Sequence, residues 1–350
     1  MKSSIFNVVG DFFALDIGSS GIRVVQLHNS GNNHTLVRYG MAPIDTKTSL
    51  SDSQLDREKV GRVIASLVSE VGINTHNVVV GLPASKTFVT IVDLPKMNPQ
   101  ELASTIKYQA DQFIPMSLDE SKVDWTVLGA SPVEPGKTEV LLASVANKFS
   151  EERMEMLESI GFDVIGLEPD ALAIARSLGT SSGSGAEMII DMGEFATDII
   201  ITYNGAPRLV RSIPTGGRTF VKSVMQSLSI DENQAQQFVY KFGLDESKLE
   251  GQIYRALEST VEIIGSEVQK SLKFFASRYQ DIAVSQIVTS GIAALLPGFH
   301  AYISIAAGNI PVQPGNSWQS INYDSSVHEQ LMNVNHQFAV AVGLAQRNSL

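Results

Sequence analysis

The segment Phe13-Ala-Leu-Asp-Ile-Gly-Ser-Ser-Gly-Ile-Arg-Val-Val-Gln-Leu27 is the most informative part of the sequence, because its pattern occurs twice in the chain. The second copy is Met188-Ile-Ile-Asp-Met-Gly-Glu-Phe-Ala-Thr-Asp-Ile-Ile-Ile-Thr-Tyr203. Each copy has an apolar run ending in Asp-x-Gly, a short turn and a second β-branched run, which predicts a hairpin. A third strand-like stretch follows each copy, at 35–44 and 208–214. We therefore predict a duplicated α/β fold in which each half opens with a β-meander.

Helical periodicity fills the segments between the predicted strands. The predicted helices are Asp56–Val71, Gln100–Phe113, Glu151–Ile160 and a long helix from about Gly251 to Tyr279, in which Gly265 is a candidate break. Asn98 or Pro99 is expected to begin the second helix, and Ser150 to cap the third. The Gly/Ser-rich loop Ser181–Gly185 just before the second meander is the clearest lobe boundary.

Composition narrows the function classes. The 350 residues are 43% hydrophobic and 18% charged, which suits a two-domain globular protein. A net charge of −11 argues against a general nucleic-acid binder, which needs a basic surface. It does not exclude a bound nucleotide, because one phosphate pocket needs only local positive potential. The absence of cysteine excludes disulfides, thiolate metal sites and cysteine nucleophiles.

The sequence predicts no direct membrane insertion. No run of 18 or more apolar residues occurs, and Met1–Gly10 does not have the pattern of a signal peptide. The stretch Ala345–Leu350 carries no basic amphipathic anchor. We therefore expect any association with a membrane to depend on a partner.

The repeated loops suggest a phosphate site. Turns of small residues expose backbone N–H groups that can cradle phosphate, and a carboxylate beside them can hold Mg²⁺ through water. The residues concerned are Asp16, Gly18, Ser19 and Ser20 in the first loop, and Asp191, Gly193 and Thr197 in the second. The sequence therefore predicts ATP and Mg²⁺ as ligands, with Asp16 and Asp191 nearest the metal. Two unrelated Asp-Gly turns are the alternative, which the matching third strands make less favoured.

This arrangement resembles the actin, Hsp70 and sugar kinase superfamily, and most closely the PilM family of pilus assembly proteins and its FtsA relatives. Arg23 stands where relatives often have Lys, Gly216-Gly217 matches a Gly-Gly before a helix, and Gly291 lies in a stretch that resembles the adenosine motif. The resemblance implies an actin-like, RNase H-like duplicated fold. Its two lobes would flank a nucleotide cleft, and one lobe would carry an inserted subdomain, called 1C.

Three further residues receive roles from the resemblance. Glu168 lies in a segment whose acid orients the attacking water in the superfamily; the alternative is an acid at a helix start, stabilised by the helix dipole. Glu267 and Lys270, one turn apart, are placed to reach the ribose and adenine; the alternative is a surface ion pair.

The resemblance also implies a subdomain plan and a partner. The plan is 1–81 with 166–185 and 332–350 (1A), 82–165 (1C), 186–226 with 273–331 (2A), and 227–272 (2B). A groove between 1C and the core would receive the N-terminal cytoplasmic peptide of a PilN-like inner-membrane protein. The chain would then be a cytoplasmic scaffold of the type IV pilus assembly platform, peripheral to the inner membrane through that partner. Self-association stays open.

Several positions depart from the family pattern. Ile292 replaces the second glycine of the adenosine motif, and Gln236 and Val239 stand where relatives have Glu and Lys. The bulky pair Glu194-Phe195 occupies the second loop, where relatives have small residues. The sequence therefore predicts a nucleotide-binding scaffold with at most a weak ATPase activity.

Two alternatives stay open on the sequence. An FtsA-like division scaffold would be expected to have a basic amphipathic tail, which the sequence lacks. A sugar-kinase-like phosphotransferase would need a carboxylate base aimed at a substrate hydroxyl, and Glu168 is the one candidate.

Overall fold

A computed structural model of the chain describes residues 11–31, 33–180 and 185–347. It divides into two compact units. Unit 1 contains Met1–Ser177, Trp318–Leu331 and Phe338–Leu350, and unit 2 contains Leu178–Ser317 and Met332–Gln337. Of the predicted lobe-boundary loop, 181–184 lie outside the described residues, as do 1–10 and 348–350. The four-part subdomain plan stays a prediction.

Unit 1 is built on a six-stranded sheet with the order β14-β3-β2-β1-β4-β8. Its strands are β1 (Phe13–Ile17), β2 (Gly21–Ser30), β3 (Asn33–Pro43), β4 (Asn77–Leu82), β8 (Asp163–Pro169) and β14 (Ile321–Asn322). The first three strands form the predicted antiparallel meander. The strands β4 and β8 continue the sheet in parallel from β1.

Helices cover this sheet because its central strands β1 and β4 are mostly apolar and are buried on both faces. Phe13 and Leu15 pack on one face with α2 (Gln54–Val71) and α4 (Asn147–Ser159). The helix α11 (Ala339–Ala345) contacts β1, β2 and β4, and it packs so closely on α5 (Asp170–Leu178) that a Cβ on Gly343 would overlap the Ala173 backbone. The short helix α1 (Thr46–Ser49) has no buried residues, and α10 (His328–Val334) begins in unit 1 and ends in unit 2.

Unit 1 also carries a three-stranded antiparallel sheet within the predicted insertion, with the order β5-β7-β6. Its strands are β5 (Thr87–Pro95), β6 (Ser121–Ala130) and β7 (Lys137–Ala146). One face packs on α3 (Pro99–Gln109) through Leu102 and Ile106. The opposite face presents Leu141 and Ala143, which contact Leu172 of α5.

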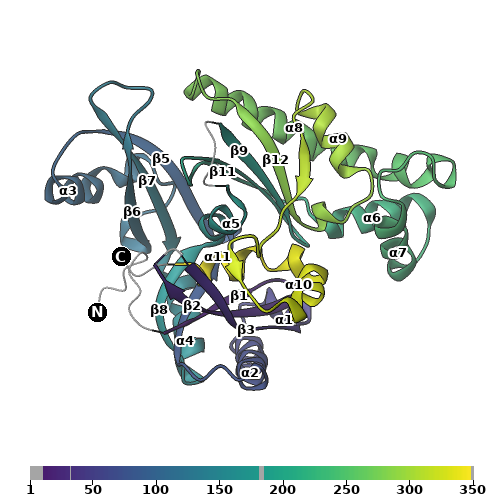
Figure 1. Cartoon of the computed structure of the whole chain (residues 1–350), viewed down its shortest axis with the longest axis horizontal. Helices are drawn as coiled ribbons and strands as arrows, with labels where there is room; N and C mark the ends of the chain where they lie inside the picture. Colours follow the sequence, from purple (N-terminus) through teal and green to yellow (C-terminus); the bar gives the residue numbers. More distant parts are fainter. Residues whose placement is uncertain (1–10, 32, 181–184, 348–350) are drawn as a thin grey trace. The chain divides into compact units, whose positions relative to one another are not determined.

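Unit 2 repeats the plan of unit 1 (Figure 1). Its strands are β9 (Ala186–Met192), β10 (Thr197–Tyr203), β11 (Ala206–Ile213), β12 (Val284–Gly291) and β13 (Val312–Pro314). The order β11-β10-β9-β12-β13 matches β3-β2-β1-β4-β8, and the antiparallel and parallel pairs fall at the same places. The predicted duplication is therefore confirmed.

The helices of unit 2 pack on one face of its sheet. They are α6 (Gly217–Leu228), α7 (Glu232–Phe242), α8 (Gln252–Arg278) and α9 (Phe299–Ala306). Met188 and Ile190 of β9 lie in one apolar core with Val261 and Ile264 of α8. Gly265 does not break α8, which is continuous over 27 residues.

The helix starts show where the sequence reasoning worked. α3 begins at Pro99, and Asn98 Oδ1 accepts from the backbone N–H groups of Gln100 and Glu101, as a helix N-cap does. The prediction that Ser150 caps the next helix was wrong. α4 begins at Asn147, and Ser150 Oγ donates to the Asn147 carbonyl from inside the first turn.

Among the residues with described positions, no helix combines the length and apolar character needed to cross a membrane.

Candidate functional site

The first loop centres on an ion pair between adjacent strands. Asp16 near the end of β1 lies opposite Arg23 of β2, and Arg23 Nη1 is 3.1 Å from Asp16 Oδ2. Burial raises the pKa of the Asp16 carboxyl above its usual value, while the charge and hydrogen bond of Arg23 oppose the rise. The positive charge of Arg23 therefore offsets part of the cost of burying the Asp16 carboxylate.

Gly18 allows a close approach in the turn after Asp16. The Gly18 N–H donates to the Gly21 carbonyl at 3.0 Å, and a Cβ on Gly18 would lie 2.9 Å from Arg23 Nη1. Ser20, beyond it, is exposed. The loop thus combines small residues, an accessible turn and an adjacent guanidinium, which fits an anion such as phosphate.

In the second loop, the predicted residues mostly support the loop itself. The Gly193 N–H donates to the Ala196 carbonyl at 2.9 Å. Thr197 is fully buried, and its hydroxyl donates to the Thr215 carbonyl at 2.7 Å. The Thr197 side chain therefore holds the end of β11 beside the loop.

The predicted Gly216-Gly217 pair lies directly against this loop. The Gly217 N–H donates to the Gly193 carbonyl at 3.0 Å, and the Arg218 N–H donates to the Glu194 carbonyl at 2.9 Å. A Cβ on Gly216 would lie 2.6 Å from the Gly193 oxygen. Loop carbonyls therefore satisfy the first donors of α6, and Gly216 permits the close approach.

Gly291 and Ile292 complete the cluster. Gly291 has φ +63°, and a Cβ there would overlap the Met192 carbonyl. Ile292 Cδ1 occupies the space where a Cβ of Gly217 would lie. The branched residue that replaces a family glycine thus packs on the Gly-Gly pair.

A second carboxylate that sequence reasoning missed lies beside Asp191. Asp198 of β10 is paired in register with Asp191 of β9, so both side chains lie on the same face of the sheet. Burial, with an added contribution from the Asp191 charge, raises the pKa of Asp198 to about 7 against a hydrogen bond from Ser212. The period of two along the second hairpin was the signal that predicts this pairing.

The bulky residues of the second loop interact with α6. The guanidinium carbon of Arg218 lies 5.9 Å from the centre of the Phe195 ring. Burial raises the pKa of Glu194, while the Arg218 charge opposes the rise. The positive charge of Arg218 therefore partly offsets the negative charge of Glu194 in this loop.

Glu267 and Lys270 form a cluster of their own on α8. Lys270 Nζ is 2.6 Å from Glu267 Oε1, and Arg211 Nη1 of β11 is 3.4 Å from Glu267 Oε2. The hydrogen bond from Lys270 lowers the pKa of Glu267. The ion pair offered as the alternative for these residues is present, and a role at a ribose stays a prediction.

Glu168 lies at the end of β8 and is 1% exposed. Its Oε1 is 2.7 Å from Arg176 Nη2, and its Oε2 is 3.2 Å from Arg347 Nε. Two arginines of the same unit therefore hold this carboxylate, which precedes the start of α5 at Asp170.

Over residues 11–31, 33–180 and 185–347, no group of three or more histidine or acidic side chains is arranged to hold a metal ion.

Comparison with known proteins identifies the family. Residues 14–349 match the family model of the type IV pilus assembly protein PilM. The chain belongs to the PilM family. A solved structure of a PilM-PilN type IV pilus biogenesis complex is similar to it with a TM-score of 0.80 and 22% identity, covering 97% of this chain and 98% of that one.

More distant structures share the fold of this PilM-family chain. The ethanolamine utilization protein EutJ from Carboxydothermus hydrogenoformans has a TM-score of 0.55 at 14% identity, covering 99% of this chain and 94% of its own. MreB5 of Spiroplasma citri bound to ADP has a TM-score of 0.55 at 11% identity, covering 95% and 94%. The predicted family and the predicted actin-like ATPase fold are confirmed, and the pilus-assembly interpretation is favoured over the division-scaffold and sugar-kinase alternatives.

Proposed function

We propose that this chain is a cytoplasmic, actin-like scaffold of the type IV pilus inner-membrane assembly platform, which binds the N-terminal cytoplasmic peptide of a PilN-like membrane protein. The observation that carries this proposal is the PilM family match over residues 14–349. Similarity over almost the whole chain to the structure of a PilM-PilN complex supports it. The chain would lie at the inner membrane through this partner.

The inserted sheet offers a docking face for such a peptide. We define this docking face by the apolar side chains Val89 and Ile91 of β5, Leu128 of β6, and Leu141 and Ala143 of β7. The two β7 residues are almost fully buried, whereas the other three are only partly buried. Partly covered apolar side chains provide pockets for the apolar residues of an extended peptide.

Strand pairing and charge add to these pockets. β6 lies at the edge of the sheet, where its backbone groups can pair with an added strand. The strand register places Asp93 on the same side of β5 as Ile91, and Asp124 of β6 opposite Ala143 on that side of the sheet. A peptide that carries basic residues beside apolar ones suits this face.

A nucleotide is the second element of the proposal. Asp16, Gly18, Ser19, Ser20 and Arg23 would hold phosphate in the first loop, where the cradle at Gly18 and the Arg23 cation fit an anion. In the second loop, Asp191 and Gly193 would approach the phosphates and Mg²⁺, with Thr197, Gly216, Gly217 and Gly291 supporting the loop. Ile292 fills the space beside Gly217, at a position where the resemblance would have a glycine, so we expect weak binding of ATP.

Peptide binding tests the proposal. The probe is a fluorescent peptide spanning the cytoplasmic N-terminus of a PilN-like protein from the same organism, titrated with the full chain. Ile91→Asp places a charge in the apolar docking face and is expected to weaken binding by about tenfold or more. The matched control Leu55→Asp, on the exposed surface of α2, is expected to bind like wild type. Equal binding by both variants, or no binding by wild type with and without Mg-ATP, would contradict the proposal.

Nucleotide binding has a separate test. A ligand that binds only the folded state must raise the melting temperature. We expect Mg-ATP to raise the Tm of wild type and to have little effect on Arg23→Gln. An unchanged wild-type Tm at millimolar Mg-ATP would contradict nucleotide binding, but it would not affect the proposal that the chain binds a PilN-like peptide.

A further inference from the structure

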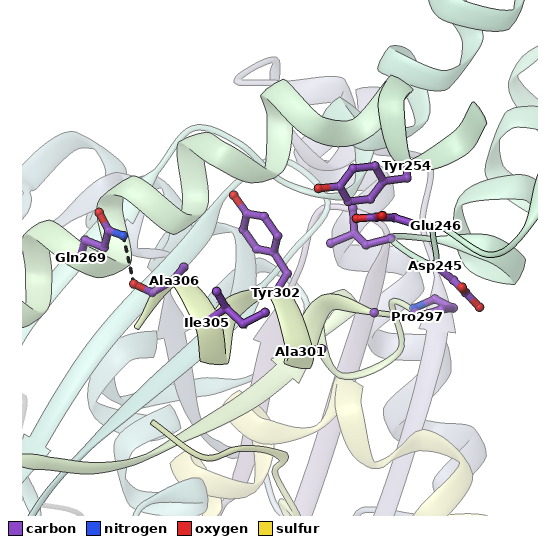
Figure 2. Close-up of a pocket in the computed structure, with 11 residues that line it drawn as sticks. Asp245, Glu246, Tyr254, Gln269, Pro297, Ala301, Tyr302, Ile305 and Ala306 are labelled. Carbon is purple, nitrogen blue, oxygen red and sulfur yellow. Dashed lines mark hydrogen bonds between the residues drawn. The ribbon is translucent and has the colours of Figure 1, made fainter. Parts of the chain in front are cut away.

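A groove in unit 2, which shares no lining residue with the docking face or the phosphate loops, has chemistry that the proposed function does not use. Its volume is about 710 Å³. The walls are the helices α8 and α9, and the loops around Glu246 and Pro297 close one end (Figure 2).

The groove is held open by defined contacts at both ends. At one end, the Leu244 N–H donates to the Pro297 carbonyl at 2.7 Å, and a Cβ on Gly298 would lie only 2.8 Å from the Leu244 backbone. At the other end, Gln269 Nε2 donates to the Ala306 carbonyl at 3.0 Å (Figure 2). These contacts pin both walls, so the groove is a preformed feature of the fold.

Two tyrosines and an isoleucine supply its apolar surface. Tyr254 of α8 and Tyr302 of α9 extend into the space between the two helices (Figure 2). Tyr302 packs against α8 at Gly265, where a Cβ would lie 3.1 Å from the ring. Ile305, on the same wall as Tyr302, is 73% exposed. Together with the two tyrosine rings, Ile305 gives the groove a contiguous apolar lining, which is typical of a binding surface.

The charged groups at the groove are acidic. Asp245 and Glu246 line it directly, and no lysine, arginine or histidine is among its lining residues. The charges of Glu258 and Glu262, one and two turns along α8 from Tyr254, also act on both tyrosine hydroxyls. Burial and these carboxylates raise the pKa of Tyr254 and of Tyr302. The carboxylates of Glu246, Glu258 and Glu262 thus act on one or both of the tyrosines, and Asp245 adds a fourth negative charge to the groove lining.

We propose that this groove binds a segment of a second partner protein in which arginine or lysine residues lie next to a large apolar residue. A cation on the face of a tyrosine gains from the ring quadrupole, and the surrounding carboxylates pair with it. The apolar neighbour packs on Ile305 and on the aliphatic wall of α9. The exposed Ile305 favours such a peptide over a small polyamine, which has no apolar side chain to place there.

A displayed library of random peptides of about 12 residues, selected on the full wild-type chain, tests the proposal. The selected peptides are expected to be enriched in arginine or lysine beside leucine, isoleucine or phenylalanine. The groove variant Glu246→Lys/Glu262→Lys is expected to bind a selected peptide about tenfold or more weakly than wild type. The control Glu58→Lys/Glu70→Lys makes the same change in net charge on exposed residues of α2, and is expected to bind like wild type.

Three results would overturn the proposal. One is that no peptide, or none enriched in basic residues, is selected. Another is that the groove and control variants bind equally, which would indicate general attraction to an acidic protein. The last is that spermidine displaces the peptide completely while Ile305→Ser leaves peptide affinity unchanged, which would assign the groove to a small cation. The PilN-like peptide should not compete with a selected peptide, so this test and that of the docking face can fail independently.

Discussion

Ile292 packs directly on Gly217, because its Cδ1 atom fills the space that a Cβ on Gly217 would need. The contact joins the start of α6 to the end of β12, and both segments carry glycines that let the backbones approach. A position that resembles a nucleotide-contacting glycine is thus part of the packing of unit 2. The relationship makes Gly217 and Ile292 energetically dependent on each other.

Gly217→Ala should therefore destabilise the protein by about 1–3 kcal/mol, the usual cost of overpacking a core. Adding Ile292→Ala should recover part of that loss, because the shorter side chain leaves room for the new methyl group. Urea unfolding of the two single variants and the double variant measures the coupling. Strictly additive losses would show that the two residues do not share this space.

The Asp16–Arg23 pair gives a second prediction. Removing Arg23 leaves a buried carboxylate without its cation, so Arg23→Gln should lower the free energy of unfolding by about 3 kcal/mol. Asp16→Asn combined with Arg23→Gln should be more stable than Arg23→Gln alone, because no unpaired carboxylate remains. Urea unfolding of Arg23→Gln and of the double variant measures the difference in stability. A double variant less stable than Arg23→Gln would contradict the idea that Arg23 offsets the buried charge of Asp16.

Glu168 gives a prediction that separates structure from catalysis. Its carboxylate is buried between Arg176 and Arg347, so Glu168→Gln should cost about 3–5 kcal/mol of stability. Glu58→Gln, on an exposed face of α2, is the control and should change little. If Glu168→Gln instead kept wild-type stability and lost only ATP hydrolysis, Glu168 would have the catalytic role that the family resemblance implies.

His34 predicts a dependence of stability on pH. Burial, and then the charge of Arg176, lowers the pKa of His34 below its usual 6.5. The unfolded chain then takes up a proton at this residue more readily than the folded protein. This contribution to stability is complete above pH 6.5 and is lost as the pH falls through the lower, folded-state pKa.

When the pH is lowered from about 7.5 to about 5.5, the free energy of unfolding should therefore fall less in His34→Gln than in wild type. Urea unfolding at the two pH values measures the difference. His28→Gln, at an exposed position on the neighbouring strand, should keep the wild-type dependence. A His34→Gln curve parallel to that of wild type would mean that His34 does not contribute.

The architecture was predictable because it depends on patterns that are local and repeated. Asp-x-Gly between apolar runs fixes each hairpin, and the two copies give the same strand order. The course of α8 was less predictable, because the effect of Gly265 depends on Tyr302, far away in sequence, which packs against it. The cap of α4 was misjudged because the first turn extends to Asn147 beyond the apolar pattern.

The chemistry of the site was only partly predictable. The sequence pattern identified Asp16, Arg23 and the glycines as candidate site residues, but it did not predict their hydrogen-bond and ion-pair partners. The Thr197 hydroxyl is used by the Thr215 carbonyl, and Glu168 is held by Arg347 from the far end of the chain. Such partners are set by tertiary packing, which no local pattern encodes. Asp198 was accessible from strand alternation, because it lies opposite Asp191 in the hairpin.

Hydrogen–deuterium exchange of the full chain, with and without the PilN-like N-terminal peptide, decides whether the inserted sheet binds this peptide. Bound peptide is expected to slow exchange in β5, β6 and β7, since an added strand protects backbone amides at the sheet edge. The strands of unit 2 should exchange as before. Unchanged exchange across 87–146 at saturating peptide, or protection confined to α8 and α9, would contradict binding at the inserted sheet.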